Sequence, residues 1–600
     1  MHTFHIPVMG LSYTIDTPVK VARFGISSVI SIIEDRLIEM MRRHYYTSRN
    51  EAFHPIDTHE TDYRAKRITD YLNLVNRMVN EQLQQLKRME FRPGTALVQY
   101  FEMLPPHHPL KQLYKKMTAT ADTAEKETLA ARLRTGIQAG SIDVNIMTKV
   151  DKNNFDRNGA LIEDGSDAVA ALRGFVNSDL TGSSVIFSAG MNPRLYNYLE
   201  KCPQFLPDDD GNFKKKVTIK VSDFRSALVQ GKYLAKKGIW VSEFRIESGL
   251  NCGGHAFPSE GYLMGPILEE FKVRKAELVD ALFTLYNQAL KSKGLKTFKY
   301  APRLAISAQG GIGTAAEDEL LRNYYQLDST GWGTPFLLVP EATTVDDATL
   351  QLLAGAQQQD LVLSRHSPIG IRFYYLNGST AQAERLLRIQ KGKPGSPCTE
   401  KHLSFNTEFT EQPICTASVQ YQTLKIAQLK SMELQEEQYQ LQLQEVLDKE
   451  CLCVGLSNAA ALRHNLVLVK NMTAVNVCPG PNIVYFNKTV SLQTMTDHIY
   501  GRVNLLEGSS RPHLLIKELQ LYLDYLEEQL QLPAQAAQPD RQNKYYDAFC
   551  ARLQEGINYY RQLHAAAVIT DSSFIPALDA AGERLQMLCS RYSTGQHTAS

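Results

Sequence analysis

Three features are scarce in this 600-residue sequence: charge of one sign, long apolar runs and cysteine. The 65 Lys and Arg residues balance 64 Asp and Glu residues, which leaves a net charge of +1 and excludes proteins that coat nucleic acid through a strong one-sign field. No stretch approaches the roughly 20 consecutive apolar residues that span a bilayer. The first residues also lack the basic and then apolar pattern of a secretory signal. Nine cysteines, an odd number, argue against a disulfide scaffold. We therefore expect a cytoplasmic protein without nucleic-acid or membrane partners.

Eight short runs rich in β-branched residues alternate with helix-like segments. They lie at residues 5–10, 28–32, 142–147, 185–190, 217–221, 239–247, 304–308 and 334–339. The alternation predicts an α/β fold with a parallel sheet. Eight such strands predict a closed (β/α)₈ TIM barrel, in which functional residues gather on the loops that follow the strands.

The rest of the chain reads as helical additions to this barrel. Residues 33–140 separate the second and third runs, and their apolar residues recur at helical spacing, which predicts a helical insertion that caps the barrel mouth. We assign residues 1–375 to the barrel with its insertion. Residues 376–600 are predicted to form a mainly helical region, with helices at about 420–447 and 514–532.

Two glycine-bearing loops fall at the seventh and eighth runs. Gly310, Gly311 and Gly313 follow the seventh run, and Gly333 and Thr334 begin the eighth. Glycine lets the backbone approach a ligand closely, and barrels of this class hold a phosphate on the loops after strands seven and eight. The sequence therefore predicts a phosphate cradle, with a tight turn that holds no ligand as the alternative.

His255 follows the pair Gly253-Gly254 at the end of the sixth run. A histidine has an ordinary pKa near 6.5, which suits a general acid or base at neutral pH. A lone histidine is more often structural, but its expected place on the rim of a barrel strand favours catalysis.

Taken in order, these motifs form a recognisable set. It consists of Pro7-Val-Met-Gly10, Val144-Asn-Ile146, Lys220, Gly253-Gly-His255, Gly310-Gly-Ile-Gly313 and Gly333-Thr334. The set resembles the nitronate monooxygenase family of FMN-dependent TIM barrels and the related flavin-dependent enoyl reductases. The resemblance covers about residues 1–375 without the insertion.

The resemblance implies non-covalent FMN in the barrel mouth. Met9 and Asn145 would contact the isoalloxazine ring, Lys220 would lie near the ring or the ribityl chain, and the two glycine loops with Gly253 and Gly254 would complete the site. His255 would remove a proton from the substrate carbon.

We favour nitronate monooxygenase-like oxidation of a small-molecule substrate. The alternative is an NAD(P)H-dependent enoyl reductase that acts on an acyl thioester, with an acyl carrier protein as partner. A second alternative is a non-catalytic module that binds a phosphate-bearing ligand or serves assembly.

The sequence departs from the family at three places. Pro335 follows Gly333-Thr334 where a basic residue is common, so one contact at the phosphate end is missing. Cys252 precedes Gly253 where Ala or Ser is usual. The long insertion at residues 33–140 is a third departure, since compact family members have no counterpart to it. All three departures bear on the substrate more than on the cofactor.

Five of the nine cysteines lie in the region that the resemblance does not cover. They are Cys398, Cys415, Cys451, Cys453 and Cys478. Their irregular spacing matches no standard zinc or iron–sulfur signature. We therefore favour buried apolar cysteines over a metal or an iron–sulfur cluster, since free cysteine is among the most buried residue types.

Overall fold

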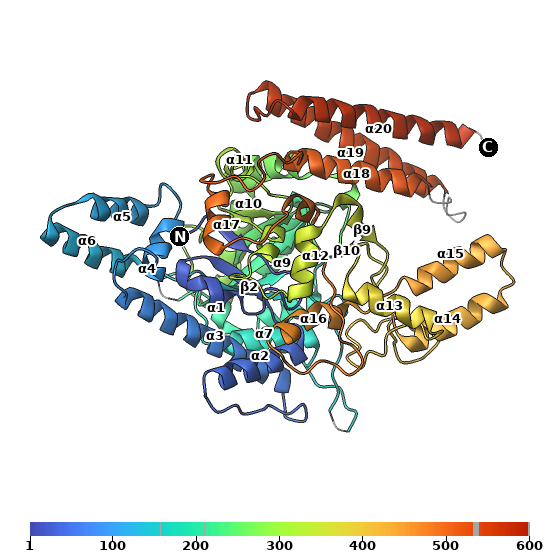
Figure 1. Cartoon of the computed structure of the whole chain (residues 1–600), viewed down its shortest axis with the longest axis horizontal. Helices are drawn as coiled ribbons and strands as arrows, with labels where there is room; N and C mark the ends of the chain where they lie inside the picture. Colours follow the sequence, from blue (N-terminus) through green and yellow to red (C-terminus); the bar gives the residue numbers. More distant parts are fainter. Residues whose placement is uncertain (157, 209, 532–538, 598–600) are drawn as a thin grey trace.

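The computed structural model describes residues 1–156, 158–208, 210–531 and 539–597. Eight parallel strands form a closed barrel in which consecutive strands are neighbours and the last strand pairs with the first (Figure 1). The strands are β1 (Phe4–Ile6), β2 (Ser27–Ser31), β3 (Ile142–Ile146), β4 (Ser183–Phe187), β5 (Lys215–Val221), β6 (Val241–Glu247), β7 (Ala305–Gln309) and β8 (Ser329–Gly331). The predicted (β/α)₈ barrel is confirmed.

The strands form where the sequence has short apolar runs because both faces of a parallel barrel strand are buried. Strand β3 and strand β4 are buried at every residue. The pairings His5 with Gly331 and Phe4 with Thr330 close the barrel.

The prediction for the eighth strand is wrong. Residues Thr334–Leu338 form a short 3₁₀ helix, and the closing strand is Ser329–Gly331 instead. Pro335 has no peptide N–H to donate to a strand ladder, which explains why this apolar segment does not join the sheet. Gly333 and Thr334 consequently lie on the loop after β8, at the carboxyl end of the barrel.

Helices follow the strands on the outside of the barrel. They are α1 (Thr17–Val21), α7 (Asp167–Asn177), α8 (Pro193–Leu199), α9 (Phe224–Ala235), α10 (Met264–Ser292), α11 (Ala315–Glu319) and α12 (Asp347–Gly355). Side-chain caps begin several of them, as where Asp223 accepts a hydrogen bond from Ser226 N at the start of α9.

The insertion between β2 and β3 is helical, as predicted. It contains α2 (Asp35–Ser48), α3 (Tyr63–Arg88), α4 (Ala96–Met103), α5 (Pro109–Ala119) and α6 (Thr123–Gly136). Helix α3 packs on α7 at the outside of the barrel, where a Cβ on Gly174 would lie 2.7 Å from Ile68 Cβ. The apolar face of α3 is therefore buried against α7, and the expectation that the insertion as a whole caps the mouth stays a prediction.

The C-terminal half is mainly helical, also as predicted. A hairpin of β9 (Leu361–Ser364) and β10 (Phe373–Leu376) leads into α13 (Thr380–Gln390), α14 (Val419–Ser431), α15 (Glu436–Leu447), α16 (Leu452–Arg463), α17 (Leu492–Ile499), α18 (Leu514–Gln531), α19 (Pro539–Ala565) and α20 (Phe574–His597). The helix predicted at 420–447 is two helices, because the chain turns at Glu433, which has a φ of +47°. Helices α14 and α15 project together from the body (Figure 1).

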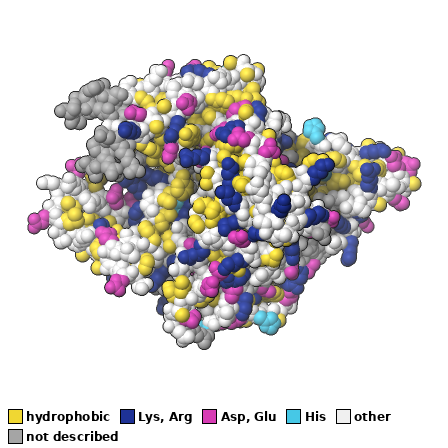
Figure 2. All heavy atoms as spheres, turned by 180° about the vertical axis from the view of Figure 1, so that it is seen from behind, with side chains coloured by type: hydrophobic (Ala, Val, Ile, Leu, Met, Phe, Trp, Pro, Cys, Tyr) yellow, Lys and Arg dark blue, Asp and Glu magenta, His cyan; other side chains and the backbone are white. Residues whose placement is uncertain are grey.

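The surface reflects the balanced composition. Figure 2 shows Lys and Arg interspersed with Asp and Glu over the face it presents. Among the described residues, no helix combines the length and the apolar character needed to cross a bilayer.

Candidate functional site

The carboxyl ends of the barrel strands carry a connected polar group. Lys220 Nζ on β5 lies 3.1 Å from Glu247 Oε2 at the end of β6. Gln309 Nε2, at the end of β7, donates to Glu247 Oε1 at 2.6 Å. Burial opposes the charge on Glu247, but Lys220, Gln309 and Lys149 together hold its pKa below the ordinary value. Lys220 is thus placed in the barrel mouth as predicted, although its partner Glu247 was not anticipated as a site residue.

Asn145 has an unusual position in this mouth. It lies on β3 with 1% of its surface exposed, and its Nδ2 has no hydrogen-bond partner among the described residues. Gln309 Oε1 is likewise buried without a partner. A buried polar group without a partner costs about 1–3 kcal/mol. These two atoms are among several buried polar atoms of the barrel that lack a partner among the described residues, as are His5 Nε2 and Asn251 Oδ1.

Met9 and Gly333 lie side by side on the first and last loops of the mouth. A Cβ on Gly333 would come within 3.3 Å of Pro7 Cγ and 3.7 Å of Met9 Sδ. The sequence set Pro7 to Gly10 and Gly333-Thr334 is thus brought together in space.

The loop after β7 is closely packed. Gly310 and Gly311 have φ values of +113° and +73°, and a Cβ on Gly311 would lie 1.9 Å from Asn251 Nδ2. Glycine is required at Gly311 by both the backbone angle and this contact. The Asn251 side chain therefore fills the space beside this loop that a bound ligand would need.

The peptide N–H groups that follow are also occupied. Glu317 accepts hydrogen bonds from Gly313 N at 2.8 Å and from Thr314 N at 3.1 Å, and forms a capping box with Thr314. The position where an anion would meet this loop is thus held by a carboxylate of the chain itself.

Arg511 of the C-terminal region completes this arrangement. Its guanidinium makes two contacts with Glu317, at 2.8 and 2.9 Å, and donates to Gly311 O at 2.6 Å. The side chains of Arg511 and Glu317 are only 4% and 2% exposed. A Cβ on Gly313 would lie 2.6 Å from Arg511 Cζ. Sequence reasoning missed Arg511, and the absence of a basic residue after Thr334 was the one available hint.

A second C-terminal segment, residues 478–480, lies between the loops after β6 and β8. Gly480 N donates to Thr334 Oγ1 at 2.9 Å, and Gly254 N donates to Cys478 O at 3.2 Å. A Cβ on Gly253 would lie 2.5 Å from Cys478 O, so glycine permits this close approach. The predicted loop residues Gly253, Gly254 and Thr334 are brought together, but they contact protein.

His255 lies on the same loop and packs against the β9–β10 hairpin. Its Nε2 is 2.7 Å from Ser367 Oγ, and its ring centroid is 5.0 Å from that of Phe373. Burial, with a smaller effect of Lys149, lowers the pKa of His255 to about 3. The imidazole is therefore neutral at pH 7 but a weaker base than an ordinary histidine, so in this conformation its environment does not strengthen the predicted role in removing a proton.

The mouth thus fits FMN at one end and not at the other. Unpaired Asn145 Nδ2 and the cation of Lys220 suit the carbonyl and nitrogen acceptors of a flavin ring. The Glu317 carboxylate and the 478–480 segment fill the places that a phosphate would need. In this conformation the predicted phosphate cradle does not fit a phosphate.

Four of the five C-terminal cysteines lie elsewhere. Cys398, Cys415, Cys451 and Cys453 line one cavity beside α16, whereas Cys478 lies in the barrel mouth. None of these five cysteines forms a disulfide.

No family model and no curated protein matches this sequence. Solved structures match weakly. FabK from Thermotoga maritima is 13% identical with a TM-score of 0.29, over 67% of this chain and 86% of that one. The enoyl reductase domain of MlnA from Bacillus amyloliquefaciens is 14% identical with a TM-score of 0.31, over 70% and 88%. Nitroalkane oxidase from Streptomyces ansochromogenes is 11% identical with a TM-score of 0.29, over 65% and 87%. These scores are too low to carry an argument about function, so the site is judged on its own residues.

Proposed function

We propose that this protein is an oxidoreductase that binds FMN without covalent attachment, with the ring end at Asn145, Lys220 and Glu247. The observation that carries the proposal is the buried Asn145 Nδ2 near the carboxyl end of β3, which has no partner among the described residues. Buried polar groups are normally hydrogen-bonded, and an acceptor of a bound flavin would satisfy this donor. When bound, FMN would supply the redox chemistry.

Binding requires a rearrangement at the phosphate end. The 478–480 segment is held to the barrel loops by two hydrogen bonds, from Gly480 N and to Cys478 O. Its withdrawal would uncover Gly253, Gly254 and Thr334 without disturbing a strand. His255, neutral and fixed by Ser367, would then accept a proton from the substrate.

The flavin content of the full-length protein tests this proposal. We expect purified protein, or protein titrated with FMN, to hold one flavin per chain and to quench its fluorescence. Lys220→Ala and Asn145→Ala should each weaken FMN binding about tenfold, since each removes one polar contact of about 1.5 kcal/mol. Exposed Lys236→Ala is the matched control and should bind normally. Colourless protein that takes up no FMN would refute the proposal.

Substrate assays then separate the two flavin chemistries. Oxygen consumption with an alkyl nitronate would identify monooxygenase-like activity. Rapid flavin reduction by NADPH or NADH, followed by reduction of an acyl thioester, would identify the reductase.

A second candidate function is favoured by the packing of the phosphate end. The Glu317–Arg511 pair and the 478–480 segment suit a barrel that has lost its cofactor and serves as a scaffold for assembly. The FMN titration decides between the two candidates, because only the first predicts saturable flavin binding.

A further inference from the structure

Four cysteines from three separate segments surround one cavity outside the barrel mouth. Cys398 and Cys415 lie on the loop between α13 and α14, Cys451 is the N-cap of α16, and Cys453 lies in the first turn of that helix. The cavity has a volume of about 220 Å³, and all four cysteines line it. The fold thus gathers thiols that are widely and irregularly spaced in the sequence.

The thiols lie close to one another and to peptide N–H groups. Cys451 and the peptide N–H groups of Glu400 and Lys401 lie close enough to Cys398 to lower the pKa of its thiol. The peptide N–H groups of Ala417 and Val454 likewise act on the thiols of Cys415 and Cys451. N–H groups directed at sulfur stabilise thiolate ligands and are a general feature of protein iron–sulfur sites.

Positive charge lies near the thiols and would offset part of the burial that raises the pKa values of Cys415 and Cys453. Cys451 and Cys453 lie at the start of α16, a 12-residue helix whose positive end faces them. Lys401 and His402 line the cavity, and Lys152 lies close enough to interact with Cys398 and Cys453. These cations oppose the negative charge that grouped thiolates would bring.

The loop that carries Cys398 and Cys415 has little regular secondary structure. It runs from Lys391, after the end of α13, to Ser418, before α14 begins. Backbone hydrogen bonds from Ser396 N to Ala417 O and from Val419 N to Ser396 O join its two ends. Connections longer than about 15 residues without secondary structure are uncommon in compact domains and are usually functional. Binding of a metal centre can stabilise the folded form of such a loop.

The cysteine sulfurs do not converge closely enough to hold a single zinc ion. A zinc ion with Zn–S bonds of about 2.3 Å holds its four sulfurs about 4 Å apart. Among the described residues, the one group of three or more candidate ligands within 4.8 Å of one another is Glu34, Glu400 and His402, and no three cysteine sulfurs meet that limit. The thiols therefore surround the cavity instead of converging on its centre.

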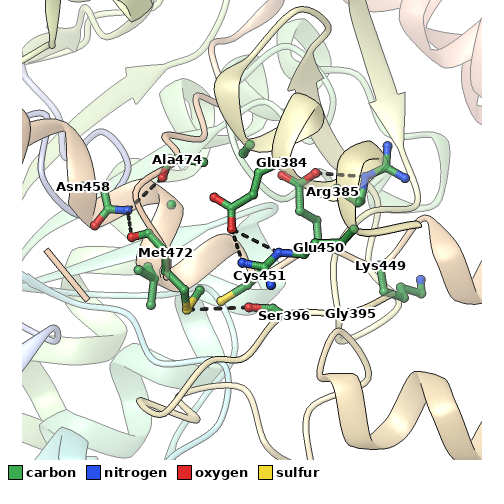
Figure 3. Close-up of a pocket in the computed structure, with 14 residues that line it drawn as sticks. Glu384, Arg385, Gly395, Ser396, Lys449, Glu450, Cys451, Asn458, Met472 and Ala474 are labelled. Atoms are coloured by element: carbon green, nitrogen blue, oxygen red, sulfur yellow. Dashed lines mark hydrogen bonds and ion pairs between the residues drawn. The ribbon is translucent and has the colours of Figure 1, made fainter. Parts of the chain in front are cut away.

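Cys451 also borders a neighbouring polar pocket. That pocket shares Cys451 and Ser396 with the cysteine cavity and contains the buried pair Arg385 and Glu450, 3.1 Å apart (Figure 3). The pocket has a volume of about 50 Å³, so the larger cysteine cavity is the one with room for a cluster.

We infer that Cys398, Cys415, Cys451 and Cys453 ligate an iron–sulfur cluster in this cavity. The inference does not depend on flavin binding, because the cavity and the barrel mouth share none of the residues used in either argument. It replaces the interpretation of these four cysteines as merely buried thiols.

Metal and sulfide analysis of the full-length protein tests the inference. The protein is purified without oxygen, reconstituted with ferric iron, sulfide and a thiol reductant, and desalted. We expect iron and acid-labile sulfide in equal amounts per chain, with visible absorption that bleaches on reduction. FMN is measured separately after acid release, so a failure of flavin binding leaves this result readable.

Cysteine variants locate the site. Cys415→Ser and Cys453→Ser should each lower bound iron and sulfide at least tenfold, whereas Cys478→Ser in the barrel mouth and Cys202→Ser in the core should leave both unchanged. Size-exclusion elution and circular dichroism confirm that each variant is folded. If Cys453→Ser does not fold, half-buried Cys415 provides the test alone.

Three outcomes would overturn the inference. One is zinc without sulfide, and another is the absence of iron and sulfide from reconstituted protein. The third is metal that persists in folded Cys415→Ser and Cys453→Ser but is lost in His402→Ala, which would place it at Glu34, Glu400 and His402.

Discussion

The barrel mouth and the cysteine cavity differ in an instructive way. The mouth carries the motifs of a ligand site, yet its phosphate end is filled by Glu317, Arg511 and residues 478–480. The cysteine cavity carries no recognisable motif, yet it is hollow and lined by four thiols. Motifs report which backbone shapes a chain can form, whereas the packing decides whether a ligand can enter.

The largest expected effect concerns the ion pair that fills the mouth. Arg511→Met keeps most of the side-chain stem but leaves the Glu317 carboxylate buried without its cation. Breaking a buried pair in this way costs about 3–5 kcal/mol. We expect a loss of that size in the free energy of unfolding, measured by urea titration. If Arg511→Met lowers the free energy of unfolding no more than the control Arg561→Met does, the pair of Arg511 and Glu317 does not hold the mouth closed.

Arg561→Met is the matched control for this measurement. Arg561 pairs with Asp579 at 2.9 Å, but both side chains are about half exposed. Exposed pairs contribute about 1 kcal/mol or less. The double variant Arg511→Met/Glu317→Gln should recover part of the loss, because it removes the uncompensated charge.

The next effect is a pH dependence at the junction between α18 and the barrel. Glu518 accepts hydrogen bonds from Ser248 Oγ at 2.5 Å and Met264 N at 2.8 Å. Burial raises the pKa of Glu518 to about 7, above the ordinary value of 4.5. Between pH 4.5 and 7 the folded state holds a proton that the unfolded state has lost, so stability falls as pH rises through this window.

Glu518→Gln should flatten this pH dependence. The raised pKa of Glu518 corresponds to about 3 kcal/mol. Between pH 5 and pH 8 the free energy of unfolding, measured by urea titration, should therefore fall by about 3 kcal/mol less in the variant than in the wild type. Glu527→Gln, on the same helix and paired with Arg584, is the control. An unchanged difference between the two pH values in Glu518→Gln would remove Glu518 from this role.

The sequence predicted most of the barrel because buried parallel strands are local apolar runs. It failed at the eighth strand because Ser329–Gly331 is short and polar, while the apolar residues after Pro335 pack as a 3₁₀ helix. The helix predicted at 420–447 failed for a related reason, since a single left-handed residue, Glu433, divides it.

The contents of the two sites could not be predicted from the sequence. Arg511 and Glu317 are 194 residues apart, and nothing in the local pattern of either residue names the other. The cysteines of the cavity likewise come from one long loop and from the start of α16, and their spacing follows no signature. The first arrangement depends on how the C-terminal half packs onto the barrel and the second on how that loop packs on α16, and periodicity reveals neither.

The smallest expected effect compares single thiols from the two regions. The hydrogen bond from Cys451 lowers the pKa of Cys398, whereas burial raises the pKa of Cys478 to about 12. Thiolates are the reactive form, so iodoacetamide should alkylate Cys398 at least tenfold faster than Cys478 in metal-free protein at pH 7. Peptide mass spectrometry measures both rates in one sample.

Cys451→Ala should slow the reaction of Cys398 because it removes the stabilising hydrogen bond, and reconstitution with iron and sulfide should block it. Faster labelling of Cys478 would reverse the comparison, since it would show that the barrel mouth opens more readily than the cysteine cavity.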